Sequence, residues 1–221
     1  MLTTLAVSNK KIPLQMSQEA LSGGSMSHVS ILVIIFFCKL ITFLGVKMSN
    51  ILVVVDIQKE YITKGRAFYI NNIGKSLTNA KKILEKARKE KWNVIHIKHL
   101  QDGKIFNPNS GYSDFVDGFI PLDNEIVLEK HNFSCFSNTK FALEMKNINQ
   151  DDNVFVIGYS STLCCLATII DGYCRGIKFN YISDASNAKK SEKFNEAELH
   201  SVMTDVLSRY ANIINSEELL F

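Results

Sequence analysis

Short apolar runs alternate along the chain with segments in which apolar residues recur every three or four positions. Continuous aliphatic runs are typical of strands buried on both faces of a parallel sheet. The predicted strands are residues 51–55, 93–98, 125–128, 153–157, 178–183 and 212–214. Helical spacing with charges on the opposite face predicts amphipathic helices. The predicted helices are residues 73–87, 139–145, 163–174 and 199–210.

Strands that alternate with helices predict an α/β fold in which a parallel sheet is covered on both faces. In such a sheet the ligand crevice lies at the carboxyl ends of the strands. Asp56 ends the first predicted strand, Lys130 follows the third, and Cys164 comes just after the fourth. The pattern therefore predicts that three reactive side chains, far apart in sequence, meet at one edge of the sheet.

The segment 158–164 runs from a strand through a polar turn into a helix whose first turn holds Cys164. A helix N-terminus and the ammonium of Lys130 both favour a thiolate, so we expect the pKa of Cys164 to fall toward neutrality. The backbone N–H groups of Ser160 and Cys164 are candidates for an oxyanion hole, and Asp56 for moving the thiol proton. The alternative is that Cys164 is a small buried residue at a helix start.

Three blocks of sequence, in this order, resemble a known family. Residues 53–58 (VVVDIQ) resemble its first strand, where an Asp ends the strand and a Gln follows two positions later. Residues 127–139 (VLEKHNFSCFSNT) are similar to its Lys, Ser-x-Phe and Thr signature. Residues 158–164 (GYSSTLC) resemble its nucleophile turn, and the next elements add Thr168, Asp171, Gly176, Asp184 and Ala185. The family is the isochorismatase-like cysteine hydrolases, and the resemblance covers roughly residues 50–215.

This resemblance implies a Rossmann-like three-layer α/β/α sandwich with a mostly parallel central sheet. From the amidase branch, which includes nicotinamidases and N-carbamoylsarcosine amidases, it implies an Asp56–Lys130–Cys164 triad. Such a triad hydrolyses a small amide or carbamoyl C–N bond through a thioester. The resemblance also implies a cis peptide bond between Tyr159 and Ser160, which aims the oxyanion-hole amides of Ser160 and Cys164.

Cys164, rather than its neighbour Cys165, falls at the nucleophile position of the family. Gln58, Tyr61 and Tyr159 are the candidate substrate-binding residues. The loops 57–70 and 101–122 are expected to form the pocket for a small molecule, together with a neighbouring subunit of a homo-oligomer. The second of these loops is rich in Gly, Asn, Ser and Pro.

The resemblance does not extend to the metal ligands of nicotinamidases. Those enzymes carry an Asp-x-His pattern after the second strand, whereas this chain has His96 and His99 there without the Asp. Residues three apart on a strand point to opposite faces, so the two imidazoles are poor joint ligands. Thr162 also stands where nicotinamidases have an acid or an amide. We therefore expect no metal and no other cofactor.

Three alternative functions stay open at this point. True isochorismatases cleave a vinyl ether and generally lack the cysteine, so Cys164 favours amide chemistry over that activity. Ser160, Asp184 and His200 follow in α/β-hydrolase order, but the second Gly of the nucleophile elbow is missing after Ser160. A non-catalytic binding module, tethered to a membrane, is the third.

Composition limits the partners and the compartment. A chain of 221 residues with 46% hydrophobic residues is enough for one α/β domain. Its net charge is +3, and the basic stretch 81–91 is interrupted by Glu85 and Glu90, which indicates a solvated helix face and no nucleic-acid partner. Five cysteines without framework spacing favour a reducing compartment, and we expect the cytoplasm.

Residues 1–47 differ from the rest and contain an apolar run, 31–46, broken by Lys39. The run lacks the features of a usual signal peptide. A lysine near its middle makes a membrane span costly, by about 2.5–3.5 kcal/mol. Three interpretations stay open: a start-site extension before Met48, a membrane anchor, or a buried helix. Residues 48–221 form the predicted hydrolase domain.

Overall fold

The computed structural model describes residues 49–220. Its strands are β1 (Asn50–Val55), β2 (Asn93–His99), β3 (Ile126–Lys130), β4 (Asn153–Tyr159), β5 (Asn180–Asn187) and β6 (Asn212–Ile214). Its α-helices are α2 (Lys59–Ile62), α3 (Gly74–Lys89), α4 (Thr139–Lys146), α5 (Cys164–Cys174), α6 (Glu196–Leu207) and α7 (Glu217–Leu220). Two 3-10 helices are η2 (Gly111–Ser113) and η3 (Cys135–Ser137).

The predicted apolar segment 31–46 and its three interpretations lie outside these residues. Within 49–220, no helix has both the length and the apolar character needed to cross a membrane.

The strands form one six-stranded sheet in the order β3-β2-β1-β4-β5-β6, and every pairing is parallel. The predicted α/β fold is confirmed, and the sheet is entirely rather than mostly parallel. The predicted strands and helices all occur, with small shifts at their ends. One strand differs more, because β5 continues past Asp184 as far as Asn187. The structure also adds the short helices α2 and α7, which the periodicity did not predict.

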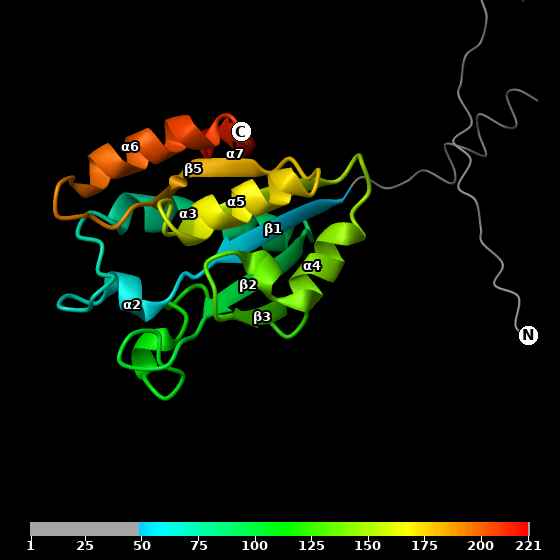
Figure 1. The fold of residues 1–221 in the computed structure, drawn as a ribbon. Coiled ribbons are helices and arrows are strands. Elements are labelled where there is room, and N and C mark those ends of the chain that lie inside the picture. Colours follow the sequence, from blue (N-terminus) through cyan, green and yellow to red (C-terminus); the bar gives the residue numbers. More distant parts are fainter. Residues whose placement is uncertain (1–48, 221) are drawn as a thin grey trace, which may run out of the picture. The chain divides into compact units, whose positions relative to one another are not determined.

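Helices cover both faces of the sheet, and Figure 1 shows α5 in front of β1 with α3 behind it. Along β1, Val53 and Val55 belong to the apolar cluster that includes α4 and α5, whereas Leu52 and Val54 belong to the cluster that includes α3. All four side chains are fully buried. Burial on both faces explains why the strand is a continuous aliphatic run instead of an alternating one.

The strand order reverses direction between β1 and β4, which is where ligands bind in open sheets of this kind. Gly158 of β4 pairs with Val55 there, and its φ of +120° lies in a region that favours glycine. A Cβ at this position would lie 2.0 Å from the backbone oxygen of Val55. Gly158 therefore lets β4 approach β1 closely at the residue that precedes Asp56.

Candidate active site

The three predicted reactive residues come together at the carboxyl ends of the strands. Asp56 directly follows β1, Lys130 is the last residue of β3, and Cys164 is the first residue of α5. Lys130 Nζ lies 2.7 Å from Asp56 Oδ2 and 3.2 Å from Cys164 Sγ. All three residues are buried, with Cys164 the most exposed at 3%. One ammonium thus bridges a carboxylate and a thiol away from bulk water.

Lys130 has two further neighbours that sequence reasoning did not assign to the site. Its ammonium lies 3.0 Å from His99 Nδ1 and donates to the backbone oxygen of Asn132 at 3.2 Å. Burial by itself lowers the pKa of Lys130, but Asp56 and Cys164 raise it by more, and the net shift is upward. The charged ammonium of Lys130 is therefore favoured in spite of its burial.

Asp56 has a backbone φ of +50°, in the left-handed region that aspartate tolerates better than most residues. Its contact with Lys130 is an ion pair. Within the described part of the chain, neither carboxylate oxygen has a hydrogen bond of regular geometry. Asp56 Oδ1 and Oδ2 thus keep lone pairs that are free to accept a proton.

The expected fall in the pKa of Cys164 is wrong for this closed site. Burial raises the pKa of Cys164 well above its usual value, the Asp56 carboxylate raises it further, and Lys130 only partly opposes them. The cause is non-local, because a thiolate would be a second negative charge beside Asp56 in a dry environment. Burial beside a carboxylate therefore favours the neutral thiol of Cys164 over the thiolate.

The turn between β4 and α5 presents two free backbone donors beside this thiol. The Tyr159–Ser160 peptide bond is cis, as the resemblance implied. The N–H groups of Leu163 and Cys165 both donate to the Ser160 backbone oxygen at 3.1 Å, which fixes the turn. Between residues 49 and 220, the N–H groups of Ser160 and Cys164 have no acceptor. These are the two donors predicted for the oxyanion hole.

The candidate substrate-binding residues are all close to the site and all buried. Gln58 Nε2 donates to the backbone oxygens of His99 and Ser113, and its Oε1 accepts from the His99 N–H. Its amide therefore joins the segment after β1 to β2 and to the 101–122 loop. The roles of Gln58, Tyr61 and Tyr159 in binding a substrate stay predictions.

The two tyrosines lie in one aromatic cluster. The Tyr61 ring centroid is 5.5 Å from that of Tyr159 and 5.4 Å from that of Phe106. The Tyr159 hydroxyl and the Ser76 hydroxyl share a hydrogen bond of 3.1 Å. Burial raises the pKa of Tyr61, and the nearby Cys164 and Asp56 raise it further. Through its contact with Tyr159, the residue before the turn, Tyr61 lies in the wall beside the reactive cluster.

Other residues of the motif blocks form hydrogen bonds that hold α5, the helix that begins at Cys164. Ser134 Oγ donates to Asp171 Oδ2 at 2.7 Å, and the Cys135 N–H donates to Thr168 Oγ1 at 3.0 Å. Both bonds tie the segment after Lys130 to α5, which carries Cys164. The motif blocks contained these residues, but only the fold shows that the Ser-x-Phe and nucleophile blocks are in contact.

Three side chains of the cluster could in principle ligate a metal, because Asp56, His99 and Cys164 offer ligand atoms that all lie within 4.8 Å of one another. Lys130 Nζ lies within 3.2 Å of an atom of each of these residues. The ammonium thus occupies the position that a metal cation would need. His96 turns away to Glu125, which it contacts at 2.9 Å, so the two histidines do not share a site.

The serine-hydrolase alternative does not fit the structure. Ser160 Oγ bonds to the Thr162 hydroxyl at 2.8 Å, whereas His200 Nδ1 bonds to Ser161 at 3.1 Å. Asp184 accepts hydrogen bonds from Ser216 instead of His200.

A cavity of about 800 Å³ lies between α4 and the end of α5. It is separate from the reactive cluster, because it includes Val154 and Lys178 near the amino ends of β4 and β5.

The all-parallel sheet and the buried Asp–Lys–Cys cluster at its strand ends define an α/β protein with a thiol at the ligand crevice. Comparison with known families identifies this class more specifically than the fold does, because the isochorismatase domain matches residues 50–218. The chain therefore belongs to the isochorismatase family of hydrolases. An uncharacterized isochorismatase family protein of Bacillus subtilis is 30% identical over 141 residues, or 62% of this chain and 77% of that protein.

Solved structures share the fold. A cysteine hydrolase from Pseudomonas syringae pv. phaseolicola has a TM-score of 0.68 and 21% identity, over 77% of this chain and 90% of that one. N-carbamoylsarcosine amidase from Thermoplasma acidophilum has a TM-score of 0.61 and 23% identity, over 76% of this chain and 97% of that one.

Proposed function

We propose that this protein is a cysteine hydrolase that cleaves the C–N bond of a small amide or carbamoyl compound through a thioester. The observation that carries the proposal is the buried Lys130 ammonium, in contact with both the Asp56 carboxylate and the Cys164 thiol. The relatives support this class of reaction, because one similar structure is a cysteine hydrolase and another is an N-carbamoylsarcosine amidase.

The charges of the cluster explain why Asp56 is the base. With Cys164 as a thiol, Asp56 and Lys130 form a neutral pair. Moving the thiol proton to Asp56 leaves a thiolate beside Lys130, so the total charge is unchanged. Burial opposes loss of that proton to water but not its transfer within the cluster. Asp56 therefore activates Cys164 without creating a net charge in the dry site.

The reaction then has two halves. Cys164 Sγ bonds to the carbonyl carbon while its proton passes to Asp56, and the N–H groups of Ser160 and Cys164 hold the oxyanion. The C–N bond breaks as Asp56 returns the proton to the leaving nitrogen. Water next attacks the thioester, and Asp56 takes a proton from that water. The C–S bond breaks, the acid product leaves, and the proton returns to the sulfur.

The test is release of ammonia or amine by the purified full chain from a panel of primary amides, ureas and N-carbamoyl compounds. Cys164→Ala should reduce release to the background level. Cys165→Ala is the matched control, because Cys165 is also buried but makes no hydrogen bond with Lys130, and it should retain most activity. If Cys165→Ala is inactive and Cys164→Ala active, the assigned nucleophile is wrong by one residue.

The same pair of variants tests the family's vinyl-ether chemistry. Cleavage of a vinyl ether does not need a thiol nucleophile. Hydrolysis of isochorismate that persists in Cys164→Ala, with no release of nitrogen from the panel, would contradict the amide proposal. Loss of all hydrolysis in Cys164→Ala supports it.

A further inference from the structure

His99, the last residue of β2, is a buried imidazole that the proposed reaction does not use. It pairs with Lys130 across neighbouring parallel strands, so the two side chains leave the sheet on the same face. His99 Nδ1 lies 3.0 Å from Lys130 Nζ, and His99 Nε2 lies 3.3 Å from Gln101 Oε1. The imidazole thus sits between the ammonium and the start of the 101–122 loop.

The chemistry of Lys130 fixes the protonation state of this imidazole. An ammonium is only a donor, so His99 Nδ1 must accept and the ring must be neutral, with its proton on Nε2. That N–H then faces Gln101 Oε1, an acceptor. Burial lowers the pKa of His99 and the Lys130 charge lowers it further, which agrees with a neutral ring.

Lys130 has three N–H groups and four neighbours within 3.2 Å. Asp56 and Cys164 take part in the proposed reaction, whereas His99 and the Asn132 backbone oxygen are neutral acceptors. We propose that His99 is a positioning residue whose imidazole accepts from Lys130 and holds the ammonium in reach of both Asp56 and Cys164. The effect on turnover rests on the proposed function, but the effect on the thiol does not.

Protonation of His99 would reverse this arrangement. The titratable groups that face it are Lys130 on β3, His131 after β3, Asp56 after β1 and Cys164 on α5. A proton on Nδ1 would point at the Lys130 ammonium, replacing a hydrogen bond by repulsion. Asp56 opposes this, but its charge already balances that of Lys130. Acid should therefore displace Lys130 and leave Cys164 without its cation.

The decisive variants are His99→Asn and His99→Leu, which have nearly the same size. Asparagine places an amide oxygen close to the position of Nδ1, so it keeps an acceptor for Lys130 that does not titrate. Leucine removes the acceptor. His96→Asn and His96→Leu are the matched controls, because His96 is also a buried histidine of β2 but contacts Glu125.

The readout is the rate at which iodoacetamide alkylates Cys164 as a function of pH, measured by mass spectrometry on the full chain. The midpoint is the pH at which alkylation reaches half of its maximal rate, and it reports the pKa of Cys164. Lys130 lowers this pKa, so a displaced Lys130 should raise the midpoint. We expect His99→Leu to raise it, and alkylation below the midpoint should slow by about tenfold each time the midpoint rises by one pH unit. His99→Asn and both His96 variants should stay within a few tenths of a pH unit of the wild-type midpoint.

Two results would overturn the proposal. One is an unchanged midpoint in a His99→Leu protein that melts within a few degrees of wild type. The other is an equal shift in His99→Asn and His99→Leu, which would assign the effect to ring packing instead of the acceptor. If His99→Leu is too unstable to measure, the midpoint of His99→Asn still decides, because a large shift there contradicts the proposal.

Turnover gives an independent measurement once a substrate of the panel is cleaved. His99→Leu should lower kcat by about 10- to 100-fold, the usual cost of a misplaced catalytic group, with KM nearly unchanged. His99→Asn should keep most of the wild-type kcat. Its kcat should also fall less in acid than that of the wild type, because asparagine does not titrate. Alkylation needs no substrate, so failure to find an amidase activity would leave the test of His99 intact.

Discussion

At the scale of single residues, the site depends on one buried cation. Lys130 lies within 3.2 Å of Asp56, His99 and Cys164, and its side chain has no exposed surface. A buried charge without partners is strongly destabilising, so the ammonium and the Asp56 carboxylate stabilise each other. The same charge opposes the upward shift in the pKa of Cys164. Lys130 thus stabilises the buried cluster, and we propose that it also takes part in the thiol chemistry.

Replacing Lys130 or Asp56 should separate these roles. Lys130→Ala and Asp56→Asn should each lower the rate by about 10²–10⁴-fold, the range for a positioned proton-transfer group. In Lys130→Ala the midpoint of Cys164 alkylation should rise, because the cation that lowers the pKa of Cys164 is gone. Lys86→Ala, at an exposed ion pair on α3, is the control and should change neither quantity. An unchanged midpoint in Lys130→Ala would exclude Lys130 from thiol activation.

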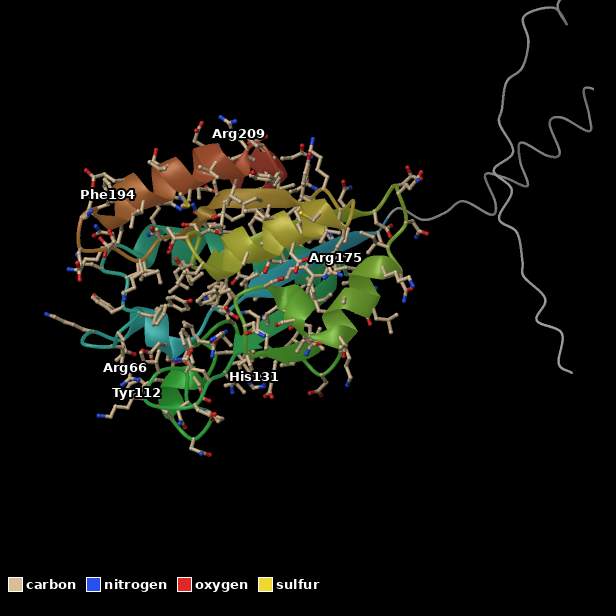
Figure 2. The ribbon with its side chains drawn as sticks, viewed as in Figure 1. Arg66, Tyr112, His131, Arg175, Phe194 and Arg209 are labelled. Atoms are coloured by element: carbon tan, nitrogen blue, oxygen red, sulfur yellow. The ribbon has the colours of Figure 1, made fainter. Side chains whose placement is uncertain are left out.

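At the scale of elements, one arginine joins the two loops at the carboxyl end of the sheet. Arg66 donates to Glu60 Oε2 from Nε and Nη2, at 3.0 and 2.9 Å, and also to the Lys104 backbone oxygen. Its guanidinium lies 4.2 Å from the Tyr112 ring centroid, and Figure 2 shows the two side chains together. Glu60 is next to Tyr61 on α2, so this contact supports the site wall.

Arg66→Ala should therefore destabilise the protein and loosen the 101–122 loop. Glu60 has no exposed surface, and an unpaired buried carboxylate costs on the order of 3–5 kcal/mol. For a domain of this size the melting temperature should fall by on the order of 10 °C. Hydrogen exchange should become faster in the 101–122 loop.

Arg175→Ala is the matched control for Arg66→Ala. Arg175 also has one ion pair, to Asp171, and one aromatic contact, to Phe136 at 4.6 Å, but both members of its ion pair are partly exposed. It lies on the other side of the view in Figure 2. Loss of the Arg175 side chain should lower the free energy of unfolding by about 1 kcal/mol or less. Equal destabilisation by the two variants would contradict the role given to Arg66.

At the scale of the whole molecule, the buried His96 and His99 and the half-buried His200 should govern the response to acid. Burial is the main cause that lowers the pKa of His96, His99 and His200 below the usual 6.5. Unfolding lets each imidazole bind a proton at a higher pH than the folded state does, so stability should fall as the pH drops below about 6.5. The pKa of Glu125 is lowered to about 2, so its contribution to the free energy of unfolding should be lost only at a pH below the range in which the histidines titrate.

Denaturant titrations between pH 8 and pH 4 test this expectation. The free energy of unfolding should be nearly constant above pH 7 and decline below about pH 6.5. His200→Asn should make the decline shallower, since one of the three groups no longer titrates. A free energy that stays flat from pH 7 to pH 5 would contradict the expectation.

The domain boundary is a second prediction at this scale. The family match begins at residue 50, and residues 48–221 form a compact unit by themselves. A chain that starts at Met48 should therefore match the full chain in melting temperature and in alkylation of Cys164. Membrane fractionation of the full chain would then choose between an anchor in 31–46 and a start-site extension. A shortened chain that does not fold would move the boundary into residues 1–47.

Predictability differed between the elements for a physical reason. The strands of the sheet centre are buried on both faces, so their aliphatic runs are visible in the sequence. Helices of four residues, such as α2 and α7, are too short to show a period. The polar end of β5 was also missed, because its extension depends on pairing with β4, where Tyr159 lies opposite Asn187. Local pattern therefore predicted the elements with strong periodicity and missed those that depend on distant partners.

The sequence by itself determined the α/β fold, the positions of Asp56, Lys130 and Cys164 at strand ends, and the family, because local periodicity and short motifs encode all three. Only the tertiary structure decided the direction of the shift in the pKa of Cys164 and the contact of His99 with Lys130. The pKa of a thiol depends on which distant groups exclude water and place charge beside it. The contact of His99 with Lys130 depends on the register between β2 and β3, which neither strand encodes alone.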